Sequence, residues 1–231
     1  MTEKIRKSHK RELTFGGLLL ALATLAYIFG WTNLFTVQDV TVSGSPNKEI
    51  TAQVLQIADI QKGEKLARVE PRNISARLAL AGINWVEGVN VSRNWLSRRV
   101  DIKLKARVPI AISATDNRFI DEAGVLFDSP VKVEQKLIEI DAPNDSARNA
   151  TVKFLLGLAD ELSGELSKIS TNQQSNSQTF ILQVSSGIQI SWGVDRDNAL
   201  KVKIYRALLA QPENKKIKYM DLSDPTKPSV R

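Results

Sequence analysis

The chain contains 231 residues, of which 42% are hydrophobic and 25% are charged, and its formal net charge is +7. This composition supports a packed core and excludes an intrinsically disordered chain. Because the sequence has no cysteine, disulfides, thiolate catalysis and cysteine metal sites are excluded, and folding depends on the core alone.

The first 35 residues have the pattern of a membrane anchor. Residues 1–12 carry five basic and two acidic side chains, and residues 13–35 are uncharged and mostly apolar. A helix needs about 20 such residues to cross a bilayer, and basic flanks stay in the cytoplasm. We therefore predict a cytoplasmic basic tail (1–12), a transmembrane helix in the lipid bilayer (13–35) and export of the remainder. A cleaved signal peptide is the alternative, because the Ala-Leu-Ala triplet at 21–23 suits a cleavage site, although apolar residues continue to Trp31 and Phe35.

The positive net charge does not indicate nucleic-acid binding. The basic tail has three excess positive charges, and the remaining 27 basic residues are mixed with 23 acidic ones. No basic run interleaved with aromatic residues forms a binding stripe, so we predict no nucleic-acid partner.

Residues 36–107 predict a small domain with the order strand, helix, helix, strand, strand. The valines at 40–42 alternate with polar neighbours, Asn47 suits a helix N-cap, and Pro71 suits the first turn of a second helix. Residues 99–108 alternate strictly between apolar and charged side chains, which is typical of a strand with one buried face. Since each element has one apolar face, we expect a sheet covered on one side by two helices.

Residues 108–231 predict a mixed, β-rich domain with two helices, so the fold class is α+β. One predicted helix has an apolar stripe that ends at Leu166, with Asp145 or Ser146 as N-cap, and the other covers residues 196–210. Leu200, Ile204 and Leu208 define the apolar face of the second helix. Hairpins, single strands and a terminal segment are expected at residues 119–127, 138–140, 180–192, 216–222 and 228–231.

Several short motifs follow the predicted span in a fixed order. They are Phe-Thr-Val at 35–37, Val-Thr-Val-Ser-Gly at 40–44, Gly-Glu-Lys-Leu at 63–66, Trp-Val at 85–86, Val-Ser-Arg-Asn-Trp at 91–95, Arg-Val-Pro-Ile-Ala at 107–111 and Asp-Glu-Ala-Gly at 121–124. In order and spacing they resemble the FtsQ/DivIB family of bacterial cell-division proteins. That resemblance implies a POTRA (polypeptide-transport-associated) domain of βααββ order followed by a β-rich domain. Leu96 and Ala106 depart from the family pattern, which usually has proline and glutamate there.

No arrangement of residues in the exported part suggests catalysis. The single histidine, His9, lies in the basic tail, so the exported part has no histidine base and no His-rich metal site. Acidic neighbours such as Asp121 and Glu122 point apart on a strand or turn, unlike the carboxylate pair of a glycosidase. We predict no enzymatic activity, no cofactor, no metal and no small-molecule substrate. An extracytoplasmic Ser-Lys hydrolase and an envelope assembly or secretion factor with a POTRA domain are the alternatives.

The resemblance implies a scaffold that links FtsL-type and FtsB/DivIC-type single-pass proteins to septal peptidoglycan synthesis, at the division septum of the bacterial inner membrane. In the family a partner docks along the last strands of the β-rich domain, and a sheet edge can accept such a segment as a further strand. The partner-binding candidates are therefore Tyr219, Leu222, Pro228, Ser229, Val230 and Arg231. For Tyr219 and Leu222 a core position is the equal alternative.

Two further groups of residues are candidates for surface contacts. The resemblance assigns a localisation role to the charged hairpin face of the POTRA-like region, for which a merely solvated surface is the alternative: Arg93, Arg99, Lys103 and Arg107. Tryptophans are enriched at binding hot spots, but burial is their commoner fate, so we expect Trp85, Trp95 and Trp192 in the core.

Overall fold

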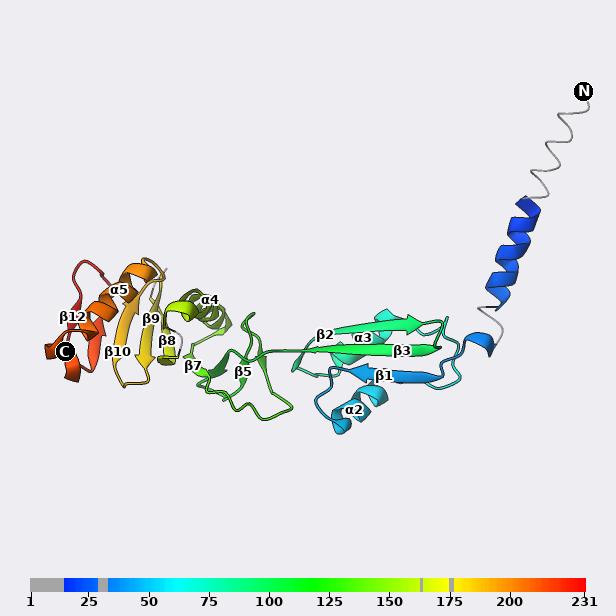
Figure 1. Cartoon of the computed structure of the whole chain (residues 1–231), viewed down its shortest axis with the longest axis horizontal. Coiled ribbons are helices and arrows are strands. Elements are labelled where there is room, and N and C mark those ends of the chain that lie inside the picture. The colour runs from blue at the N-terminus through cyan, green and yellow to red at the C-terminus, as the bar shows by residue number, and fades with distance from the viewer. Residues whose placement is uncertain (1–14, 29–32, 163, 175–176) are drawn as a thin grey trace, which may run out of the picture. The chain divides into compact units, whose positions relative to one another are not determined.

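The computed structural model describes residues 15–28, 33–162, 164–174 and 177–231 (Figure 1). The predicted basic tail at 1–12 lies outside these residues, as do parts of the predicted span at 13–35. Residues 15–28 are helical and expose their apolar side chains. Among the described residues, no helix combines the length and the apolar content that a membrane crossing requires.

The chain divides into two compact units, here called the N-terminal unit (Met1–Ala106) and the C-terminal unit (Arg107–Arg231). After a 3-10 turn, η1 (Asn33–Phe35), the N-terminal unit contains β1 (Asp39–Ser43), α2 (Lys48–Ala58), α3 (Pro71–Leu80), β2 (Val86–Asn94) and β3 (Arg99–Ala106). The sheet order is β1-β3-β2, with β1 parallel and β2 antiparallel to β3. This is the predicted βααββ order.

Local chemistry explains where these elements begin and end. The Asn47 side chain accepts a hydrogen bond from the Ile50 amide at 2.8 Å and caps α2, and Pro71 begins α3. The predicted strand at 99–108 is two residues too long, because β2 begins opposite Ala106 and offers no partner beyond it. Val108 therefore leaves the sheet and its side chain is exposed.

The C-terminal unit is built on a nine-stranded sheet of order β12-β11-β10-β9-β8-β7-β4-β5-β6. Helices α4 (Asp145–Leu162) and α5 (Asn198–Leu209) contribute to a single core with the strands. Figure 1 shows where both helices lie along the C-terminal unit. Phe154 of α4 stacks on Phe180 with ring centroids 4.1 Å apart, and Trp192 is fully buried beside them. The remaining elements are β4 (Ala111–Ser113), β5 (Phe119–Ile120), β6 (Leu126–Phe127), β7 (Ile138–Asp141), β8 (Leu166–Gln174), β9 (Ser177–Val184), β10 (Gln189–Gly193), η2 (Pro212–Lys216), β11 (Tyr219–Asp221) and β12 (Ser229–Val230).

Two details of the helices differ from the prediction. Leu166 begins β8, a strand that the polar sequence after it did not indicate, so the apolar stripe of α4 ends at Leu162. Asn144, rather than Asp145 or Ser146, caps α4, since its side chain accepts from the Ala147 amide at 2.9 Å.

The buried face of α5 includes Ile204 and Leu208 of the predicted apolar face, which pack partly buried against the core, but not Leu200. Leu200 is exposed, while its neighbour Lys201 is only 1% exposed and packs with Val202 and Tyr205. Lys201 Nζ donates to the backbone carbonyls of Trp192 at 2.7 Å and Val194 at 3.0 Å. Burial lowers the pKa of Lys201. The ammonium group thus adds a donor to two carbonyls at the end of β10, and the Val194 carbonyl also accepts from the Arg196 amide at 2.8 Å. A buried cation is tolerated because it has these partners.

Tyr205 provides a pH-dependent test of the α5 packing. Burial, and donation to the Glu165 carboxylate at 3.0 Å, raise the pKa of Tyr205 to about 12. Between pH 10 and 12 the unfolded chain loses this proton first, so the free energy of unfolding falls as the pH rises. We expect the stability advantage of the unmodified chain over Tyr205→Phe to shrink by about 2 kcal/mol in that window. Urea unfolding at several pH values measures the free energy of unfolding of both chains. If this free energy changed with pH by the same amount in the two chains, the expectation would be contradicted.

Candidate functional site: the terminal edge of the large sheet

The last strands of the C-terminal unit form one edge of its sheet. Strand β10 is parallel to β11, and β11 is antiparallel to β12, which has no further neighbour in the sheet order. The buried side chains of Met220 and Leu222 attach this edge to the core under α5. The Leu222 amide also donates to the Ser191 carbonyl at 2.8 Å, which continues the β10 ladder. The edge is therefore firmly attached to the sheet.

The connection between β11 and β12 is organised by two aspartates. Asp221 Oδ1 accepts from the amide and hydroxyl of Ser223, and Asp224 Oδ1 accepts in the same way from Thr226. These Thr226 donors lower the pKa of Asp224. The Asp-x-Ser/Thr pattern at 221–223 and 224–226 is an Asx-turn signal in the sequence. It predicts the turn at residues 224–227, where the Lys227 amide donates to the Asp224 carbonyl at 3.1 Å, whereas the turn at Asp221 was not predicted. Both turns hold β12 in register.

The hydrogen-bond pattern shows which backbone groups of β12 face outward. Arg231 and Tyr219 exchange hydrogen bonds, with Arg231 N–H to Tyr219 O at 2.9 Å and Tyr219 N–H to Arg231 O at 3.1 Å. In an antiparallel pair, alternate residues bond to the neighbour, so Val230 directs its N–H and C=O away from β11. The geometry leaves a donor and an acceptor on one residue for an additional strand.

The predicted partner residues are not equivalent. The side chain of Leu222 is fully buried in the core, as in the alternative prediction for this residue. It therefore cannot contact a partner. The Val230 side chain also packs against the core, so this residue offers its backbone rather than a side chain. Tyr219 is half-buried with the Arg231 guanidinium 5.7 Å from its ring centroid. Pro228, Ser229 and Arg231 are exposed.

The surface around this edge is basic. Within residues 215–231 there are five basic and two acidic side chains, and the basic ones are all exposed. Asp221 and Asp224 are engaged in the Asx turns described above. The positive residues are Lys215, Lys216, Lys218, Lys227 and Arg231. Such an edge suits an extended segment with acidic side chains.

The predicted charged face of the β2–β3 hairpin is largely occupied by internal contacts. Arg93 Nη1 points to the carbonyls of the loop before α3, at 3.2 Å from Val69 O and 3.3 Å from Ala67 O. Arg99 pairs with Asp101 at 2.8 Å. Lys103 is exposed. Arg93 is therefore a structural side chain, and the prediction of a free charge there is wrong.

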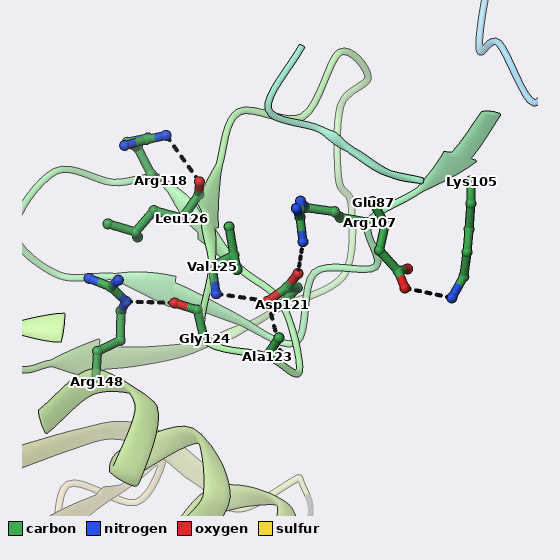
Figure 2. Close-up of polar contacts among 10 residues, drawn as sticks. All are labelled: Glu87, Lys105, Arg107, Arg118, Asp121, Ala123, Gly124, Val125, Leu126 and Arg148. Atoms are coloured by element: carbon green, nitrogen blue, oxygen red, sulfur yellow. Dashed lines mark hydrogen bonds and ion pairs between the residues drawn. The ribbon is translucent and has the colours of Figure 1, made fainter. Parts of the chain in front are cut away.

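Arg107 is likewise not a free surface charge. It pairs with the nearly buried Asp121, at 2.5 Å from Nη1 to Oδ2, as Figure 2 shows. The other oxygen of Asp121 accepts from the amides of Ala123 and Val125 in the β5–β6 turn. From the same turn, Gly124 O accepts from Arg148 of α4 at 2.8 Å. This network attaches the first residue of the C-terminal unit to its turn and helix.

These features define a class of protein: a POTRA-type unit followed by a β-rich unit with an open terminal edge. Comparison with known families supports both parts. Residues 35–107 match the model of the FtsQ-type POTRA domain, and residues 110–223 match that of the C-terminal region of the cell division protein FtsQ/DivIB. The chain belongs to the FtsQ/DivIB family of cell-division proteins.

Curated relatives agree over nearly the whole length. The cell division protein FtsQ of Streptomyces venezuelae is 28% identical over 228 residues, covering 94% of this chain and 82% of the relative. FtsQ of Streptomyces coelicolor is 25% identical over 229 residues, covering 92% of this chain and 83% of the relative.

Proposed function

We propose that the chain is a non-enzymatic scaffold of the division machinery that captures a partner by strand addition to β12. The supporting observation is the outward N–H and C=O of Val230 on a firmly attached edge. Main-chain hydrogen bonds give such a complex its affinity, and exposed side chains beside the edge give it specificity. Tyr219 and Arg231 flank this position.

The proposed partners are the FtsB/DivIC-type and FtsL-type single-pass division proteins. The basic residues around β12 favour a partner segment with acidic side chains. In this proposal residues 13–35 anchor the chain in the inner membrane at the division septum, with residues 36–107 and 108–231 as two exported domains. The exposed apolar side chains of residues 15–28 support the anchor. The assembly would connect the partners to septal peptidoglycan synthesis.

Val230→Pro is the sharpest test of this proposal, because proline removes the outward N–H. We expect the full-length chain with this change to recover FtsB/DivIC-type and FtsL-type partners at least tenfold less in a pull-down, roughly 1.4 kcal/mol of binding free energy. Val230→Ala is the matched control, since it shortens the side chain and keeps the backbone donor. A correctly folded Val230→Pro chain with full partner recovery would exclude β12 as the docking edge.

One observation favours a Ser-Lys hydrolase as a second candidate. Lys136 Nζ lies 3.5 Å from Ser185 Oγ at a cavity of about 310 Å³ lined mainly by apolar residues. Both side chains are exposed, whereas a lysine that acts as a base needs desolvation. We therefore favour the scaffold. Release of soluble products from peptidoglycan by the purified chain, abolished by Ser185→Ala, would reverse that preference.

A further inference from the structure

The turn of the β2–β3 hairpin exposes a large apolar side chain. Leu96 is 98% exposed in the four-residue turn 95–98. Leu34 of η1 is also exposed, at 61%. Single exposed leucines are common on protein surfaces, so exposure alone does not assign a role.

Hydrogen bonds at both ends of the turn stabilise its conformation. Asn94 Oδ1 accepts from the Ser97 amide at 3.1 Å, and the Arg98 carbonyl accepts from the Gln38 amide at 2.8 Å. The Arg93 guanidinium lies 5.5 Å from the centroid of the Trp95 ring. With these contacts the backbone presents Leu96 to the solvent.

The turn lies beside the point where the apolar N-terminal segment enters the folded unit. The rings of Trp95 and Phe35 meet edge to face with centroids 6.0 Å apart, which joins the hairpin turn to η1. Four residues separate the apolar helix 15–28 from η1, and an extended link of that length spans at most about 18 Å. Any bilayer that holds the apolar segment is therefore within short reach of the turn.

The composition of this surface matches the interface of a lipid bilayer. Aromatic rings such as those of Trp95 and Phe35 are enriched at the headgroup level, and leucine partitions into the acyl boundary. Arg98 lies in the same turn and adds positive charge, which is attracted to anionic lipid headgroups. Apolar, aromatic and basic side chains occur together here.

We infer that the hairpin turn 95–98, together with Leu34, docks on the bilayer surface and inserts Leu96 at the headgroup level. This inference rests on the proposed membrane anchor. The anchor makes the contact intramolecular, so these two leucines suffice where a free domain would need a larger patch. The docked turn would restrict the orientation of the N-terminal unit on the membrane.

A single fluorescent label tests the inference directly, because the chain has no native cysteine. Leu96→Cys is labelled with an environment-sensitive NBD dye in the full-length chain, which is reconstituted into vesicles with and without anionic lipid. Leu80→Cys is the matched control, since Leu80 is 87% exposed and lies before the opposite end of β2, about 25 Å along the strand. We expect blue-shifted emission and at least threefold stronger quenching by a lipid-borne quencher at position 96 than at position 80.

The possible results distinguish a failure of the proposed membrane docking from a failure of the proposed membrane anchor. A chain that floats with the vesicles but shows equal, water-like emission at both positions overturns membrane docking and leaves the anchor intact. A chain that does not float overturns the anchor and the docking together. Stronger quenching at position 96 in anionic than in neutral vesicles supports the contribution of Arg98, and insertion in both lipids supports the apolar contact.

Discussion

Gly44→Ala is expected to destabilise the N-terminal unit by about 2–5 kcal/mol, which is enough to unfold a small domain. Gly44 follows β1 with a φ of 81°, in the left-handed region that disfavours a side chain. A Cβ atom there would lie 2.1 Å from the backbone oxygen of Leu104 in β3. Since a backbone carbonyl cannot rotate away, β1 and β3 must separate.

Gly82→Ala is the matched control for this substitution. Gly82 has a similar φ of 71°, but nothing lies within 4 Å of an added Cβ. It should therefore show the conformational penalty alone, about 1–2 kcal/mol. Hydrogen exchange of peptides from β1 and β3, followed by mass spectrometry, measures both variants. Equal protection in the two variants would show that the Leu104 contact has no energetic consequence.

Asp121→Ala is expected to destabilise the C-terminal unit by about 3–5 kcal/mol. The Asp121 side chain is 5% exposed, and its removal leaves the Arg107 guanidinium without its carboxylate. The same change leaves the amides of Ala123 and Val125 without their acceptor. The expected readout is faster hydrogen exchange in the β5–β6 turn and in the first turns of α4.

An exposed ion pair of similar length provides the control. Lys105 Nζ and Glu87 Oε1 lie 2.6 Å apart (Figure 2), yet their side chains are 71% and 39% exposed. Glu87→Ala should cost about 0–1 kcal/mol, because water replaces the lost partner. The loss of stability is measured in the C-terminal unit for Asp121→Ala and in the N-terminal unit for Glu87→Ala. Comparable losses of stability in the two variants would contradict a special role for the buried pair.

Local sequence patterns determined most of the elements. The alternation in β3, the Asn47 cap and the Pro71 start depend on contacts within a few residues, and each was predicted correctly. Strand β8 was missed because its residues are largely polar, so neither period nor composition distinguished it from a loop. It forms because β7 and β9 supply ladder partners on both sides.

The candidate site needed the tertiary structure. The sequence by itself determined the family and an apolar-polar alternation near residues 219–222, but this alternation could not show which side chains face water. Only the fold decided that Leu222 is in the core, that Arg93 and Arg107 bond internally, and that Val230 presents its backbone at an edge. The physical reason is that burial and hydrogen-bond partners depend on segments distant in the chain, whereas caps, turns and periodicity depend on near neighbours.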